Sequence, residues 1–220
     1  MTKSQASSSF ALEYLSNSTD LRTPINGVIG MSKLLLEGSE PLSVNQQEQI
    51  KYIEHNGQTI LYFFNNLLDA SRIDTGKLNL DFQELDLIHL INTFTELPFY
   101  LFFDNREVEI QKQVPDKAPT IWADKYRMRQ IITEGIRHIA TLCPPEDIIK
   151  LGVDYDMSMV RLNISSENPS SFTDRNFLSD EMTSLEFFIC KKLIELHDGN
   201  ISIRNDDVLE LTISLPIKKE

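Results

Sequence analysis

The segment Ser16–Gly30, SNSTDLRTPINGVIG, lies within a longer stretch whose apolar residues follow the spacing of one helix face. From about residue 8 to residue 38, apolar side chains recur at intervals of three, four and seven: Phe10, Tyr14, Leu21, Ile25, Val28 and Leu35. This period predicts an amphipathic helix. Pro24 lacks the N–H that an internal helix residue donates, so we expect it to kink or distort this helix.

A second helix is predicted to follow after a short turn. The turn is EGSEPLS, Glu37–Ser43, and the helix runs from about Val44 to Ser71 with apolar residues at Ile50, Ile53, Ile60, Leu61, Phe64, Leu67 and Leu68. Two long helices with a short connection form an antiparallel hairpin. Because one hairpin cannot bury both apolar faces, residues 1–76 are predicted to form a homodimeric four-helix bundle.

Beyond the segment RIDTGKLNL the pattern changes, at about Lys77, to short runs typical of β-strands. The predicted strands are Leu78–Phe82, Val108–Val114, Ile149–Val153, Val160–Ser165, Ile201–Arg204 and Leu209–Leu215. Three helical stretches lie between them, at about Leu87–Leu97, Lys125–Thr141 and Met182–His197. Strands that mix with helices without strict alternation predict an α+β domain, an α/β sandwich, over residues 77–220.

Composition narrows the classes of ligand. Among 220 residues, Lys and Arg number 21 against 33 for Asp and Glu, and the resulting net charge of −12 disfavours nucleic acid and anionic membranes. The longest apolar run, Leu97–Phe103, is too short to span a bilayer, and Met1–Ser9 is too polar for a signal peptide. Only two cysteines, Cys143 and Cys190, are present, without CxxC spacing. We therefore expect a reduced, cytoplasmic chain with no direct membrane insertion.

Four segments, taken in order, resemble those of one protein family. STDLRTPINGVIGMSKLLL is similar to a phosphoacceptor box, Ser-His-Glu-Leu-Arg-Thr-Pro, and NNLLDASRIDTGKLNL to the end of the second helix and the linker after it. WADKYRMRQIITEGI resembles the entry to an Asn-containing helix, and ICKKLIELHDGNISIRN the helix and strand after a second glycine box. The chain thus resembles the transmitter core of bacterial sensor histidine kinases, which implies a phosphotransfer-type hairpin followed by an ATPase-like domain.

The resemblance also shows which reactive residue is replaced. In the family a histidine attacks the γ-phosphate of ATP and passes the phosphoryl group to an aspartate, and Thr19 occupies that position here. A hydroxyl without a base is a poor nucleophile at neutral pH, and a phosphothreonine ester would be too stable to transfer its group. No catalytic residue of the kinase reaction is therefore expected at this position.

The nucleotide-binding boxes of the family are altered as well. Glu134 and His138 stand where the resemblance implies two asparagines that hold Mg²⁺ and phosphates. The carboxylate would repel a triphosphate, and imidazole is a poor ligand for Mg²⁺.

The adenine-binding box, Asp-x-Gly-x-Gly, aligns with Ser166, Asn168 and Ser170, and the second glycine-rich box with MTSLEFF, which has no glycine. We therefore expect no cofactor, with ATP and Mg²⁺ binding lost, and no metal.

Part of the phosphoacceptor box is kept. The family's phosphatases use an acid beside the histidine and a Thr or Asn four residues after it, and Asp20 and Thr23 match these. An ATP-independent phosphatase acting on a response regulator is therefore one alternative, and solvated remnant residues are another. Thr19, Asp20, Arg22 and Thr23 are together predicted to form a docking face for a partner.

The remaining candidates involve histidines and aromatics. His55 is an alternative phosphoacceptor for a phosphotransferase, although counting from the turn places it roughly 12 Å below Thr19. His197, before a glycine, is expected to have a structural capping role, and Glu134 with His138 offers only two ligands for a metal. The aromatics Phe187, Phe188 and LPFYLFF are predicted to be core or, where exposed, a partner surface.

The preferred hypothesis is a catalytically inactive histidine-kinase-like regulator of two-component phosphorelay signalling. Its expected partners are a second copy of itself and either a response-regulator receiver domain or an active histidine kinase.

Overall fold

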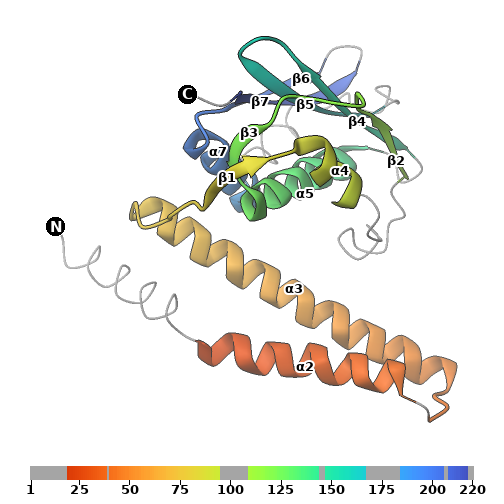
Figure 1. Cartoon of the computed structure of the whole chain (residues 1–220). Coiled ribbons are helices and arrows are strands. Elements are labelled where there is room, and N and C mark those ends of the chain that lie inside the picture. The colour runs from red at the N-terminus through yellow and green to blue at the C-terminus, as the bar shows by residue number, and fades with distance from the viewer. Residues whose placement is uncertain are drawn as a thin grey trace. The chain divides into compact units, whose positions relative to one another are not determined.

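A computed structural model of the chain describes residues 19–38, 40–94, 109–143, 147–166, 184–205 and 208–217. The chain divides into two compact units, one reaching to Leu78 and the other starting at Asn79. Figure 1 shows that the first is helical and that the second combines a sheet with helices. None of the helices in the described ranges is both long and apolar enough to cross a bilayer.

The first unit is a hairpin of two helices, α2 (Thr19–Glu37) and α3 (Val44–Asp74). The predicted start of the first helix, near residue 8, lies outside the described residues. Helix α2 continues through Pro24. Helix α3 begins at a capping box, in which the Ser43 hydroxyl accepts from the Gln46 N–H and the Gln46 side chain accepts from the Ser43 N–H. It extends three residues beyond the predicted end.

Contacts between α2 and α3 fix their register. Arg22 Nη2 donates to Asn65 Oδ1 at 2.8 Å. Lower in the hairpin, a Cβ added to the buried Gly57 would lie 2.9 Å from Ile29 Cγ1, so the absence of a side chain permits the two helices to approach closely. These pairings run in opposite directions along the two helices, which confirms the antiparallel hairpin.

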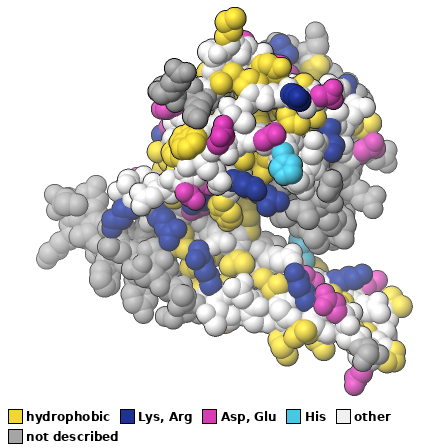
Figure 2. Space-filling view, viewed as in Figure 1, with side chains coloured by type: hydrophobic (Ala, Val, Ile, Leu, Met, Phe, Trp, Pro, Cys, Tyr) yellow, Lys and Arg dark blue, Asp and Glu magenta, His cyan; other side chains and the backbone are white. Residues whose placement is uncertain are grey.

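Many apolar side chains of the hairpin are exposed, as yellow areas on its surface in Figure 2 show. On α2 they are Leu21, Val28, Met31, Leu34 and Leu35, and on α3 they are Val44, Tyr52, Ile53, Ile60, Phe63 and Leu67. Ile53, Ile60 and Leu67 recur every seven residues and therefore form one stripe along α3. A single hairpin leaves this stripe in contact with water.

The second unit contains a five-stranded mixed sheet in the order β2-β4-β5-β7-β6. Strand β2 (Glu109–Gln113) pairs in parallel with β4 (Ile148–Tyr155), and the other pairs, made by β5 (Met159–Ser166), β7 (Leu209–Pro216) and β6 (Asn200–Asn205), are antiparallel. Alternate residues of β4, β5 and β7 are buried, so one face of the sheet is covered. Helices α5 (Lys125–Leu142) and α7 (Leu185–Leu196) cover that face.

Two shorter strands correct the prediction from sequence. Strand β1 (Phe82–Leu85) begins where the predicted strand Leu78–Phe82 was expected to end, and it pairs antiparallel with β3 (Ile121–Asp124), which the sequence did not predict. The alternation in LNLDFQEL runs through Leu78, Leu80 and Phe82 and stops at Glu84, so it does not locate β1, whose residues are set by pairing with β3. Helix α4 (Leu87–Phe94) follows β1, and the rest of the predicted helix to Leu97 lies outside the described residues.

Asp124 and His197 join several elements of this unit. The Asp124 carboxylate caps α5 by accepting from the N–H groups of Tyr126 and Arg127, and it also accepts from the Asp81 N–H. His197 ends α7, is buried, and accepts the Asp124 N–H at Nε2 while Nδ1 lies 2.7 Å from the Leu193 carbonyl oxygen. This histidine therefore has a structural role at the end of the helix.

Candidate functional site

Helix α5 brings two of the predicted site residues to one buried face. Its N-terminus is fixed by Asp124, and its apolar residues pack on the sheet, so the positions facing inward include Glu134 and His138, one turn apart. Both side chains are almost fully buried, at 6% and 7% exposure. A buried carboxylate and a buried imidazole need compensating contacts.

Glu134 receives its compensation from the same helix. Arg137, three residues later, donates to Glu134 Oε2 from Nε at 3.0 Å and from Nη2 at 2.6 Å. Residues three apart on a helix are neighbours, and a guanidinium bound to a carboxylate makes a strong charge-assisted pair. A carboxylate held in this way is already neutralised without a metal ion.

His138 packs against an aromatic ring from the other helix. The ring centroids of His138 and Phe187, on α7, lie 4.9 Å apart with the planes at 33°. Burial, with a smaller contribution from the Arg137 charge, lowers the pKa of His138 to about 4. The imidazole is therefore neutral at physiological pH.

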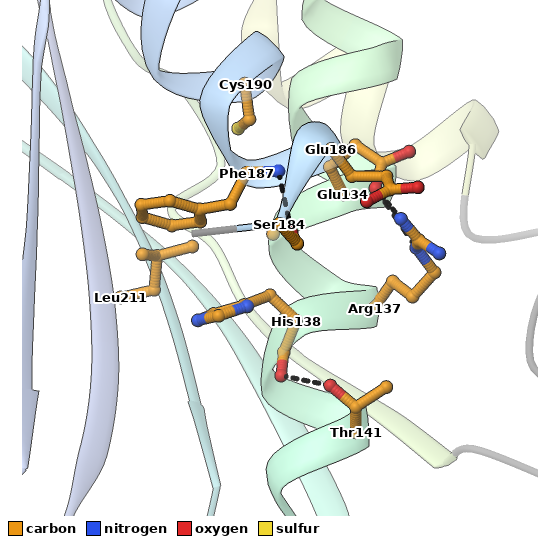
Figure 3. A pocket seen from close by; sticks show the side chains of 10 residues that line it. Glu134, Arg137, His138, Thr141, Ser184, Glu186, Phe187, Cys190 and Leu211 are labelled. Carbon is orange, nitrogen blue, oxygen red and sulfur yellow. Dashed lines mark hydrogen bonds and ion pairs between the residues drawn. The ribbon is translucent and has the colours of Figure 1, made fainter. Parts of the chain in front are cut away.

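A cavity of about 220 Å³ lies between α5 and α7 at these residues. Figure 3 shows Phe187 and Leu211 on one side of it and Glu134, Arg137 and Glu186 on the other. The complete lining within the described ranges is Glu134, Gly135, Arg137, His138, Thr141, Ser184, Glu186, Phe187, Cys190 and Leu211. The volume is below the roughly 300–1,000 Å³ usual for pockets that hold drug-sized ligands.

The residue at the predicted adenine-binding position, Ser166, also hydrogen-bonds within the protein. Ser166, at the end of β5 and buried, donates its hydroxyl to Asp147, a buried residue just before β4. Cys143, at the end of α5, interacts with both, and burial raises the pKa of its thiol to about 11. Asn168 and Ser170 lie outside the described residues. No sequence pattern pointed to Asp147, whereas the i, i+3 spacing of Glu134 and Arg137 could have indicated their ion pair.

The predicted docking face on the hairpin is only partly described. Thr19 and Asp20 lie in the first turn of α2, and their side chains fall outside the described part. Thr23 is exposed. Arg22 is half-buried, and besides its hydrogen bond to Asn65 it lies over the Phe64 ring, 6.0 Å from the centroid. Arg22 thus joins α2 to α3, a role that the sequence did not indicate.

His55 is further from Thr19 than the sequence suggested. The pairings of Arg22 with Asn65 and of Ile29 with Gly57 put His55 level with residue 31, which is twelve residues below Thr19. At 1.5 Å per residue the separation along the helix axis is about 18 Å, against the predicted value of roughly 12 Å. The difference arises because these pairings place the centre of the hairpin near residue 43, whereas the predicted value was counted from Pro41.

The remaining predicted residues divide between core and surface. Phe187 is buried as predicted, but Phe188 is 41% exposed, because adjacent helical residues lie 100° apart and cannot both face the sheet. LPFYLFF, Leu97–Phe103, lies outside the described residues. Within the described ranges, no three His, Cys, Asp or Glu side chains are grouped so that they could hold a metal ion.

A helical hairpin followed by an α/β unit is the organisation of a sensor histidine kinase transmitter core, and the comparisons with known proteins match it. Residues 18–76 match the His Kinase A (phospho-acceptor) domain.

Among curated proteins the chain is 26% identical, over 91% of its length, to the autoinducer 2 sensor kinase/phosphatase LuxQ of Vibrio parahaemolyticus. It is 28% identical, also over 91% of its length, to the circadian input-output histidine kinase CikA of Synechococcus elongatus. The chain spans only 26% and 29% of these relatives. A solved structure of full-length ShkA in complex with AMPPNP has the same fold, with a TM-score of 0.68 at 22% identity over 96% of this chain and 46% of that one.

Proposed function

We propose that this chain is a catalytically inactive histidine-kinase-like regulator of two-component signalling, which acts by binding and not by phosphoryl transfer. The observation that carries the proposal is the pair of contacts at the nucleotide-site positions. Glu134 is neutralised by Arg137, and His138 is covered by Phe187. Together with Thr19 at the phosphoacceptor position, these contacts argue against both halves of the kinase reaction.

The proposal predicts that the chain does not bind Mg-ATP and does not accept a phosphoryl group from it. Thermal unfolding with and without Mg-ATP tests the first point, since a ligand at 100 times its dissociation constant would stabilise the folded state by about 2.7 kcal/mol. The Thr19→His chain tests the second, because it restores the nucleophile alone. We expect no thermal shift and no acid-labile phosphate on Thr19→His. A clear shift, or label on the restored histidine, would contradict the loss of nucleotide binding.

We propose that the exposed apolar stripe on α3 forms the dimer, either with a second copy or with the hairpin of an active kinase. Burial of such a stripe supplies the association energy in helical bundles. Leu67→Glu, within the stripe, should convert the dimer to a monomer in sedimentation experiments. Val44→Glu is the control, because Val44 is also exposed but lies about 140° around the helix axis from Leu67. Equal effects of the two changes would contradict this interface.

The proposed partner of the upper hairpin is a response-regulator receiver domain, and the site of action is the cytoplasm. Exposure of Thr23 beside the phosphoacceptor position supports a docking role. Receiver domains or histidine-kinase hairpins should therefore be identified when the chain is used to capture proteins from its own cytoplasm. Capture of neither class would count against the proposal.

One enzymatic alternative has a specific observation in its favour. Thr23 is exposed, Asp20 is present, and LuxQ is named a sensor kinase/phosphatase. Incubating the chain with a phosphorylated receiver domain would distinguish this alternative. If the chain releases phosphate and Thr23→Ala does not, the chain is a phosphatase. If the lifetime of the aspartyl phosphate is unchanged, the phosphatase alternative is excluded and the binding role is retained.

A further inference from the structure

The cavity between α5 and α7 contains one acidic residue that the contacts above do not explain. Glu186 lies in the first turn of α7, is half-buried, and lines the cavity. In the part of the chain that the structure describes, it forms no ion pair.

The other ionisable side chains of the lining do not balance Glu186. The charges of Glu134 and Arg137 compensate each other at 2.6 Å, and His138 is neutral. Counted over the lining side chains that the structure describes, one negative charge is in excess. A partly enclosed site with that charge attracts cations and excludes anions, polyphosphates above all.

The rest of the lining combines the apolar side chains of Phe187, Cys190 and Leu211 with Gly135 and the hydroxyls of Thr141 and Ser184. Phe187 and Leu211 lie on the side opposite Glu134, Arg137 and Glu186 (Figure 3). A cavity of roughly 150 Å³ in another protein accepts a benzene ring. The 220 Å³ available here therefore has room for one ring and a small polar group.

We propose that this cavity binds a small organic cation, formed by one apolar or aromatic body and one primary amine or amidinium group. The body contacts Phe187 and Leu211, and the cationic group donates hydrogen bonds to Glu186. A planar amidinium suits a carboxylate because two N–H groups can bind both oxygens. The inference rests on the proposed function, since a site that retained Mg-ATP would have to accommodate a polyanion.

Benzamidine is a suitable probe, with benzamide and benzoate as neutral and anionic analogues of similar shape. We expect titration calorimetry on the full chain to detect benzamidine binding with a dissociation constant near or below about 1 mM. Benzoate should not bind. Benzamide should bind about tenfold more weakly or not at all, because a charged hydrogen bond contributes more than a neutral one.

Glu186→Gln tests the assignment of the residue, and Glu195→Gln is its matched control. Both lie on α7, but Glu195 is exposed and pairs with Lys192 outside the cavity. We expect Glu186→Gln to weaken benzamidine binding about tenfold or more and Glu195→Gln to leave it unchanged. Equal thermal unfolding midpoints of the two unliganded variants would exclude misfolding.

The outcomes separate this inference from the proposed function. No benzamidine binding up to about 10 mM, equal affinity for benzamide, or full binding by Glu186→Gln would overturn the cation site, whatever the chain does with ATP. Binding of Mg-ATP in the same calorimeter would overturn the proposed loss of nucleotide binding, whatever happens with benzamidine.

Discussion

Acidification is predicted to destabilise the second unit through His138. The folded unit holds this imidazole at a pKa of about 4, whereas the unfolded chain should titrate near the ordinary value of 6.5. Between these values the unfolded state binds more protons, so stability is complete above pH 6.5 and is lost as the pH falls toward 4. Lowering the pH from 7 to 5 should remove about 2 kcal/mol through this group alone.

The assay is urea unfolding at pH 7 and pH 5, followed by the fluorescence of Trp122. This is the only tryptophan of the chain, and it lies on β3, so it reports on the second unit. Other groups titrate over the same range, among them His197, whose pKa burial also lowers. The informative quantity is therefore the difference between the wild type and His138→Asn.

His138→Asn should reduce the loss between pH 7 and pH 5 by about 2 kcal/mol, and His89→Asn should not change it. His89 is the control because it is exposed on α4. Parallel pH dependences of the wild type and His138→Asn would refute the reasoning, because they would mean that the imidazole is not desolvated in the folded unit.

Three further predictions concern packing, capping and thiol chemistry. Gly57→Ala should be about 1–3 kcal/mol less stable than Gly30→Ala in thermal unfolding, since both gain the same helix propensity but only Gly57 faces a close side chain. Ser184→Ala should cost about 1 kcal/mol in urea unfolding, because the Ser184 hydroxyl accepts the Phe187 N–H that caps α7. A thiol reagent at pH 8 should react with Cys143 and Cys190 at least about 100-fold faster in urea than in the folded chain, since burial raises both pKa values. Rapid modification of the folded chain would contradict their burial.

The fold could be predicted from the sequence where the pattern was long, and it was missed where a partner strand decided the outcome. Periodicity over many turns located α3 and α5 within a few residues. Strand β3 has only four residues, Ile121–Asp124, which is too short to show alternation beside a helix signal. The position of β1 depends on β3, since its residues are defined by the pairing of Phe82 with Asp124 and of Leu85 with Ile121.

The candidate site was predictable in its positions and not in its contacts. Alignment with family motifs selected Glu134 and His138, and both lie at the cavity. The ring that covers His138 comes from Phe187, 49 residues later on another helix, and no local pattern reports such a pairing. The contact made by Arg22 was likewise not predicted from the sequence. A charged residue beside a reactive position suggested a docking role, but its guanidinium bonds within the hairpin, to Asn65.

The proposed division between lost chemistry and kept binding has a physical basis. Phosphoryl transfer requires a nucleophile and a nucleotide site at once, so under this proposal either Thr19 in one unit or the contacts around His138 in the other would be enough to prevent it. Binding requires only that a surface keep its shape. The Arg22–Asn65 hydrogen bond and the close approach at Gly57 hold the two helices of the hairpin in register. The apolar stripe through Ile60 and Leu67 therefore keeps a fixed geometry, which is what a partner hairpin needs in order to pack against it.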